Sequence, residues 1–140
     1  MLFYNEKIFK RCFNYKGKYW YKNIKYIPLY FTLMHQLIKY GYDEYATWET
    51  FSWFTDTMRS VLTNYRKNHY GYPAEMSEVE WDKTIDHMIE LLDLMDDGNP
   101  KYDDTEYDGG SGLQRQYAEM EAAKDEFFAL FSKYFYNMWD

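Results

Sequence analysis

The sequence predicts a small all-α protein, in which about four helices form a bundle behind a basic, aromatic N-terminal extension. Apolar residues recur at intervals of three and four along most of the chain, which is the period of amphipathic helices. Gly and Pro stand between these periodic segments and mark their ends. The length of 140 residues suits one domain with a sizeable core, so we expect a single domain over residues 1–140.

The first periodic segment follows Pro28, which suits the first residue of a helix because its missing N–H group costs nothing there. Gly41 is the expected stop of this helix. The apolar positions between them are Tyr30, Leu33, Met34, Leu37 and Ile38. Residues 1–27 form the basic extension. The Gly within the polar cluster 14–18 predicts a turn there, in either a short hairpin or two helical turns.

The second periodic segment predicts a long helix with Asp43 as its N-cap, or Thr47 as an alternative. Its apolar stripe comprises Trp48, Phe51, Phe54, Met58, Val61, Leu62 and Tyr65. Gly71 and Pro73 lie in the segment that ends it, residues 68–73.

Ser77 and Glu80 form a capping box, which predicts the start of a third helix. The expected buried stripe of this helix is Trp81, Ile85, Met88, Leu92 and Met95. Residues 98–112, rich in Gly and acids, predict a flexible acidic loop. A last helix is expected over about 113–138, with one face marked by Tyr117, Met120, Phe127, Phe131, Tyr134 and Met138. We expect Trp48, Trp81 and Trp139 to belong to the core.

Charge is unevenly distributed along the chain. Residues 1–42 hold eight Lys or Arg against one acid, whereas residues 43–140 hold eight against 22 acids, so the two parts carry +7 and −14. Such a chain can place a basic arm against its own acidic body, or can offer each part to a different partner.

The third helix carries a stripe of five acids at intervals of 4, 4, 3 and 4, namely Asp82, Asp86, Glu90, Asp93 and Asp97. At 100° per residue they occupy an arc of about 80°. A solvated face is the common reason for such a stripe. However, these carboxylates repel one another and no Lys or Arg lies within the arc, so the stripe can also imitate a nucleic-acid backbone and bind a basic groove.

The N-terminal extension interleaves cations with aromatic rings. The candidate binding residues of this basic arm are Lys10, Arg11, Lys16, Lys18, Trp20, Lys22 and Lys25. Cations beside stacking rings suit single-stranded nucleic acid or a nucleotide. We favour the interpretation that the rings pack on the bundle, and we do not expect direct binding to nucleic acid, because the acid excess elsewhere repels phosphates.

We find no catalytic, metal-binding or cofactor motif. His35, His69 and His87 are isolated from one another, and the usual zinc spacings are absent. The acidic segment that begins at Asp104 resembles a calcium loop at first, but Arg115 occupies the position of the bidentate Glu. Cys12 has no general base that the sequence can pair with it. We therefore expect a non-enzymatic protein with no metal and no cofactor.

Several short motifs together resemble a group of small, acidic, bacteriophage-encoded proteins of unknown function. They are Gly41-Tyr42-Asp43 before Trp48, Gly71-Tyr72-Pro73, Ser77 to Trp81, Asp86-His87-Met88-Ile89, Phe131-Ser132-Lys133-Tyr134-Phe135 and Met138-Trp139. The resemblance implies a phage origin and a helical fold, and it brings no catalytic residues.

Together these observations predict an inhibitor of a host nucleic-acid-binding defence complex, similar in action to an anti-CRISPR protein, which binds by acidic mimicry. The expected partners are a host complex with a basic groove, or a second copy of the chain, without a membrane, in the cytoplasm of the bacterial host. The alternatives are a virion or packaging component that self-associates, and an anti-defence protein that sequesters a nucleotide through Trp20 and its basic neighbours.

Overall fold

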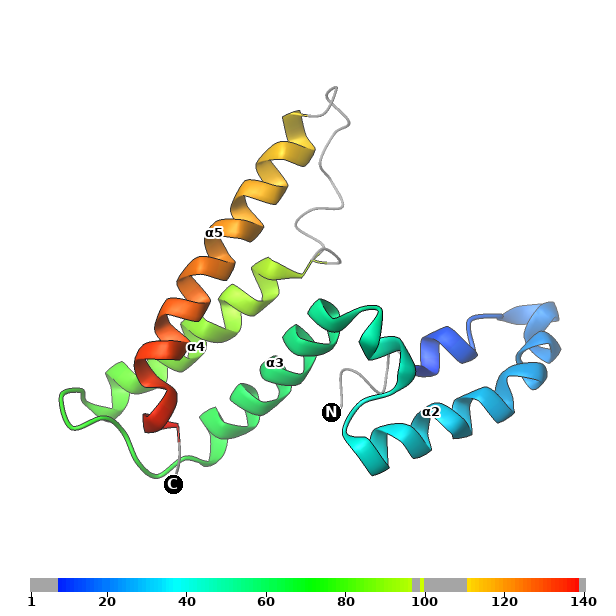
Figure 1. Ribbon diagram of the computed structural model, residues 1–140, viewed down its shortest axis with the longest axis horizontal. Coiled ribbons are helices and arrows are strands. Elements are labelled where there is room, and N and C mark those ends of the chain that lie inside the picture. Colours follow the sequence, from blue (N-terminus) through cyan, green and yellow to red (C-terminus); the bar gives the residue numbers. More distant parts are fainter. Residues whose placement is uncertain (1–7, 97–98, 100–110, 139–140) are drawn as a thin grey trace. The chain divides into compact units, whose positions relative to one another are not determined.

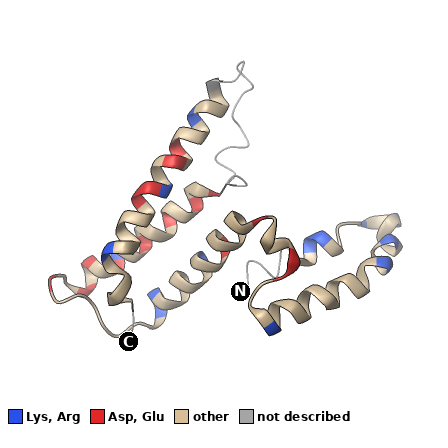
Figure 2. Cartoon of the chain, viewed as in Figure 1, with Lys and Arg blue, Asp and Glu red and all other residues tan. Residues whose placement is uncertain are grey.

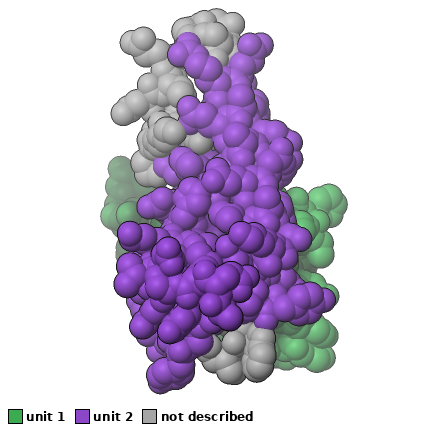
Figure 3. Space-filling view, turned by 90° about the vertical axis from the view of Figure 1, so that its left-hand side faces the viewer, with its two compact units in different colours: residues 1–60 green, residues 61–140 purple. Residues whose placement is uncertain are grey.

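The computed structural model describes residues 8–96, 99 and 111–138 (Figure 1), and every regular element among them is helical. The predicted all-α class is therefore confirmed. The chain divides into two compact units, residues 1–60 and 61–140 (Figure 3). Two compact units can belong to one domain, so the single domain over residues 1–140 stays a prediction.

The first unit begins with helical residues 8–12 and continues with a 3-10 helix, η1 (Gly17–Tyr26), that leads into α2 (Ile27–Tyr40). The extension is therefore helical, with a turn at residues 13–16, which is one of the two predicted arrangements. Gly41 ends α2 as predicted. Its φ of 80° lies in the left-handed region that favours Gly, and its N–H group donates to the carbonyl of Leu37.

A compact apolar core holds this unit together. Ile8 and Cys12 from the first helical residues lie in one cluster with Leu33, Leu37 and Ala46, all of them buried. Partly buried side chains pack around this cluster, namely Phe13, Tyr26, Leu29, Tyr30, Met34, Tyr45 and Trp53.

The start of the second predicted helix differs from the prediction. Asp43 caps a separate 3-10 turn, η2 (Glu44–Thr47), through its side chain and the Ala46 N–H group, and α3 (Thr50–Asn68) begins only afterwards. Trp48 thus lies between two helical segments and is 86% exposed, so its expected place in the core is wrong.

The α3 helix ends at Asn68, as the following Gly and Pro predicted. Its stripe is less deeply buried than predicted, because Phe51 and Val61 are exposed while Leu62 is buried. Thr55 and Asp56 are buried as well, and Arg59 donates to the Asp56 carboxylate over 3.1 Å.

In the second unit, α4 (Glu78–Met95) and α5 (Ser111–Tyr134) run side by side in opposite directions, and a short 3-10 turn, η4 (Phe135–Asn137), follows α5 (Figure 1). The capping box is present, with Ser77 accepting from the Glu80 N–H group and Glu80 accepting from that of Ser77. All five positions of the predicted α4 stripe are buried, which confirms the period that the sequence shows.

The core between α4 and α5 is aromatic at one end. The Trp81 and Tyr134 rings meet edge to face at 5.2 Å, and Phe127 is fully buried further along α5. Removing side chains of this size from water contributes about 1.5–3 kcal/mol each. The first turns of α5 extend beyond the end of α4 (Figure 1), and Tyr117 there is exposed, unlike its predicted place on the buried face.

Some predictions fall on residues that the structure does not describe. Asp97, Trp139 and nearly all of the acidic loop 98–112 lie outside the described residues. Within the described part, no helix has both the length and the apolar character needed to cross a membrane.

Candidate functional site

The structure places four members of the predicted acidic stripe along α4, namely Asp82, Asp86, Glu90 and Asp93. Asp97 lies outside the described residues. The stripe occupies the side of α4 that is turned away from its buried residues, because Trp81, Ile85 and Leu92 point into the core. Figure 2 shows Asp and Glu distributed along both α4 and α5.

One end of the stripe is bound by a cation from another helix. Arg66, near the end of α3, donates from Nη1 to Asp82 Oδ1 over 2.9 Å and from Nε to Asp86 Oδ1 over 3.0 Å. The guanidinium lies close enough to relieve the repulsion between these two carboxylates. The side chains of Asp82 and Asp86 are 24% and 51% exposed, so Asp82 belongs more to this network than to the surface.

His69 completes the network. Its Nε2 lies 2.9 Å from Asp82 Oδ1, its Nδ1 lies 3.0 Å from the carbonyl oxygen of Gly71, and its ring stacks on Tyr65. The imidazole is only 4% exposed. These contacts fix the turn after α3 against the start of α4, so His69 holds the local structure and is not a solvated histidine.

The acidic stripe continues from α4 onto α5 through His87. The His87 Nε2 lies 2.8 Å from Glu126 Oε1 of α5, and its Nδ1 lies 3.7 Å from Glu90 Oε2 on its own helix. Glu90 and Glu126 are 75% and 55% exposed, so both carboxylates remain open to solvent. Because one imidazole contacts both carboxylates, the two helices present one continuous acidic surface.

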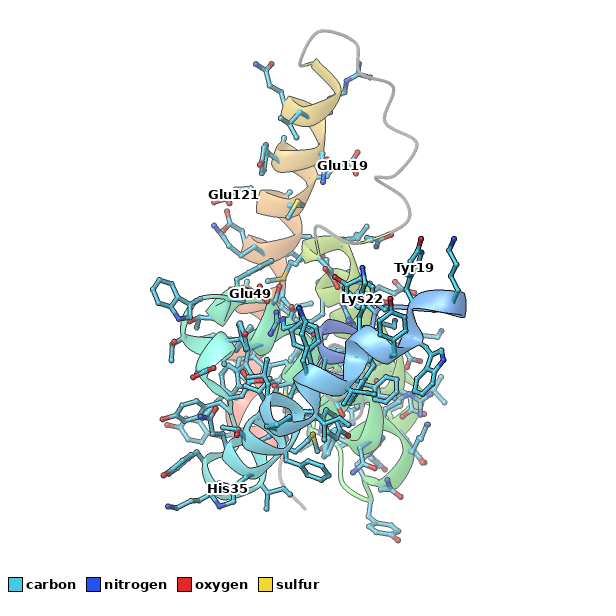
Figure 4. The ribbon with its side chains drawn as sticks, turned by 90° about the vertical axis from the view of Figure 1, so that its right-hand side faces the viewer. Tyr19, Lys22, His35, Glu49, Glu119 and Glu121 are labelled. Carbon is cyan, nitrogen blue, oxygen red and sulfur yellow. The ribbon has the colours of Figure 1, made fainter. Side chains whose placement is uncertain are left out.

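The α5 helix exposes further carboxylates. Glu121 and Asp125, 66% and 74% exposed, flank Lys124, which forms an ion pair with each of them. The hydrogen bond to Glu121 is the largest of the effects that raise the pKa of Lys124. Figure 4 shows that Glu119 and Glu121 point to different sides of α5. The spacing of Glu121 and Asp125 from Phe127 predicts that both are exposed, but the period of one helix carries no information on its contacts with another.

The basic arm divides into an engaged part and an exposed part. Arg11 donates to Glu49 over 3.0 Å and lies 4.0 Å from the centre of the Tyr45 ring, so it serves the packing of its own unit. Lys10 is exposed on the helical residues 8–12. The other members lie on η1 or at its N-cap, and all are exposed, namely Lys16, Lys18, Trp20, Lys22 and Lys25.

The aromatic rings of η1 do not pack into a core as the favoured interpretation expected. No residue of η1 is buried, and Tyr19, Trp20 and Tyr21 are 45%, 62% and 53% exposed. Only Tyr26, at the end of η1, packs against the core cluster of the first unit. The geometry of a 3-10 helix explains this exposure. With three residues per turn its side chains form three rows, and only one row can face α2.

The described residues offer little for catalysis or metal binding. An open hollow of about 220 Å³ is lined by Gln36, Tyr40, Tyr42, Asp43 and Glu44, a set without a nucleophile beside a base. Among the described residues, no group of three or more His, Cys, Asp or Glu side chains could hold a metal ion. Burial raises the pKa of the Cys12 thiol, which disfavours the reactive thiolate.

No protein-family model matches the chain, and neither a curated protein nor a solved structure matches it. The resemblance to small acidic phage proteins therefore stays a prediction.

Proposed function

We propose that the chain is a non-enzymatic inhibitor that binds stoichiometrically to a nucleic-acid-binding defence complex in the cytoplasm of a bacterial host. The acidic surface of α4 and α5 would occupy a basic groove of that complex. The proposed phage origin rests on the sequence resemblance alone, whereas the acidic surface supports the proposed mode of binding.

The continuity of exposed carboxylates across two helices is the observation that supports this proposal. Together α4 and α5 contain ten Asp or Glu and four Lys or Arg, a net charge of −6. Asp82 to Asp93 place four carboxylates over eleven residues of helix, about 5.5 Å of helix axis per charge. One strand of a duplex carries a charge every 3.4 Å, so the carboxylates of α5 are needed to bring the surface near the charge density of a nucleic acid.

The internal network narrows the part of the surface that is available to a partner. Arg66 already neutralises the end of the stripe at Asp82 and Asp86. Glu90 and Asp125 are the better contacts, because their carboxylates are about three-quarters exposed, with His87 Nδ1 3.7 Å from Glu90 and Lys124 Nζ 3.5 Å from Asp125. A basic groove would desolvate these carboxylates on binding, which gives charge complementarity its effect on association rate and specificity.

Charge reversal at Glu90 and Asp125 tests the proposal. A tagged Glu90→Lys/Asp125→Lys protein would be compared with the wild type in pull-downs from nuclease-treated bacterial lysate at low and high salt. The matched control is Glu44→Lys/Glu75→Lys, which changes the net charge by the same amount at two exposed positions outside α4 and α5. Circular dichroism would verify that each variant keeps its helicity.

We expect the wild type and the control to retain a nucleic-acid-binding protein at low salt, and the reversed variant to lose it. An added oligonucleotide should displace the partner, because both ligands would occupy the same groove. Equal retention by all three proteins would refute the acidic-surface mechanism. Equal loss from both variants would show that only net charge matters, which also contradicts a defined surface.

Exposed aromatic side chains support a second candidate function, self-association as a virion or packaging component. Phe135 and Tyr136, on η4, are 53% and 83% exposed, and each ring of the series Phe131, Phe135 and Tyr136 meets the next edge to face. Such an aromatic surface suits contact between copies. A defined oligomer in light scattering that persists in high salt and without a host partner would favour this function over inhibition.

A further inference from the structure

The 3-10 helix η1 exposes its side chains to an unusual degree. It runs for ten residues, whereas 3-10 helices seldom exceed four, and none of its residues is buried. Side chains three positions apart eclipse one another in such a helix, and about 6 Å of axis separates them. Tyr19, Lys22 and Lys25 therefore form one row, which Lys16 extends at the N-cap.

This row joins cations to aromatic faces. The Lys22 ammonium lies 4.9 Å from the centre of the Tyr19 ring and 5.5 Å from that of Tyr15, and the Lys18 ammonium lies 5.0 Å from the Tyr19 ring. Figure 4 shows the Tyr19 and Lys22 side chains on η1. The ion pairs of the described residues leave Lys16, Lys18, Lys22 and Lys25 without a carboxylate partner, so their charge is available to an outside ligand.

The backbone that carries this row is held in place. The Asn23 side chain accepts from the Tyr15 N–H group over 3.1 Å and donates to the Tyr15 carbonyl over 2.8 Å. This two-way contact closes the turn before η1, and Gly17, with a φ of 58°, supplies the left-handed residue that the turn requires. A ligand would thus meet rings and charges that are already positioned, which lowers the entropy lost on binding.

We propose that η1 binds single-stranded nucleic acid through the η1 surface, defined as Lys16, Lys18, Tyr19, Trp20, Lys22 and Lys25. The lysines would contact successive phosphates, and the exposed rings of Tyr19 and Trp20 would stack on bases. Stacking requires unpaired bases, so single strands are favoured over duplex. An acidic protein surface could pair with the lysines but offers no flat faces for the rings, and so explains less of the surface.

This inference reverses an expectation from the sequence, because the structure removes one of its two premises. That expectation assumed that the rings pack on the bundle, and they are exposed. Its other premise, the acid excess, applies mainly to residues 61–140, which hold seven Lys or Arg against 18 acids, whereas residues 1–60 hold nine against five. The unit that carries η1 therefore has a net charge of +4 of its own, which favours the phosphates of a bound strand.

Fluorescence anisotropy with a labelled single-stranded oligothymidylate tests the inference, with the matching duplex as a comparison. Trp20→Ala removes a stacking ring, and Trp48→Ala is its control, because Trp48 is another exposed tryptophan of the same unit. Lys18→Glu/Lys22→Glu removes two cations. Its control is Lys39→Glu/Lys67→Glu, which makes the same change of charge at two other exposed lysines.

We expect the single strand to bind more tightly than the duplex. Trp20→Ala should weaken binding by about 5- to 150-fold, as the loss of one base–ring stack does, while Trp48→Ala should leave it unchanged. With four phosphate contacts, the plot of log K against log salt should have a slope of about −3, which Lys18→Glu/Lys22→Glu should reduce to about −1.4. The Lys39→Glu/Lys67→Glu slope should equal that of the wild type.

Three results would overturn the inference. One is the absence of oligonucleotide binding at low salt, and another is equal weakening by each variant and its control. The third combines two findings: the wild type does not bind the oligonucleotide, and sedimentation velocity shows salt-sensitive self-association that Lys18→Glu/Lys22→Glu abolishes. This result would identify a second copy of the chain as the occupant of the η1 surface. The Glu90→Lys/Asp125→Lys variant should keep oligonucleotide binding, so failure of the inhibitor proposal and failure of this one remain distinguishable.

Discussion

Replacing Arg66 by Met tests the network that joins the end of α3 to α4. Met retains most of the aliphatic stem of Arg66 but removes both of its contacts, at 2.9 Å to Asp82 and 3.0 Å to Asp86. An exposed ion pair contributes about 0.2–1 kcal/mol, and the partly buried Asp82 raises the upper end of this range for its pair. We therefore expect Arg66→Met to lower the free energy of unfolding by about 1–2 kcal/mol.

Thermal and urea unfolding would measure this loss, which corresponds to about 3–7 °C in Tm for a chain of this size. A double-mutant cycle with Asp86→Asn isolates the pair itself, because the His69 imidazole contacts Asp82 and not Asp86. We expect the two single losses to exceed the loss in the double variant by about 0.5–1 kcal/mol. Strictly additive losses, or an unchanged Tm in Arg66→Met, would refute the idea that this arginine stabilises the start of α4.

Further predictions concern the cap, the tryptophans and the cysteine. Ser77→Ala should cost about 0.5–2 kcal/mol in urea unfolding, as the loss of an N-cap does. Hydrogen bonds from Ser77 hold the pKa of Glu80 below its usual 4.5. The stability that Glu80 contributes is therefore full above pH 4.5 and is lost as the pH falls through the lowered pKa. Glu80→Gln should remove this part of the acid dependence of Tm. Trp81→Ala should cost about 3–5 kcal/mol, whereas Trp48→Ala should stay within about 0.5 kcal/mol, and similar losses would contradict their different burial. A thiol reagent at pH 8 should label Cys12 only after unfolding in guanidinium chloride, because burial raises the pKa of the thiol above 9.0.

Local signals in the sequence were sufficient to predict most helix ends. Gly41 ends α2 because only a residue tolerant of positive φ suits that position, and Ser77 with Glu80 starts α4 because each satisfies the backbone N–H of the other. These interactions span at most four residues, so a sequence of one chain displays them. The buried stripe of α4 was predictable for the same reason, since a regular helix fixes which residues share a face.

Predictions failed where a second segment decides the outcome. Trp48 continues the spacing of Phe51 and Phe54, but the turn that Asp43 caps ends before α3 begins, so Trp48 leaves the helical face. The cation that balances the acidic stripe comes from Arg66, twenty residues before Asp86 in the chain. No period along α4 can reveal a contact that the connection between two helices creates.

Arg66→Met also tests the inhibitor proposal, because the proposal predicts that this variant is less stable than the wild type but binds its partner faster. Removing the guanidinium makes the stripe more negative by one charge at Asp82 and Asp86, on the helix that also carries Glu90. If the stripe binds a basic groove, Arg66→Met should associate with the partner faster than the wild type at low salt. We expect a gain of about a few-fold, because one charge is added to the electrostatic attraction. The gain should vanish at high salt. Surface plasmon resonance at two salt concentrations would measure both rates. A variant that is less stable yet binds faster would separate the structural role of Arg66 from the binding role of the carboxylates around it. An unchanged association rate at low salt would instead place the binding face away from this end of α4.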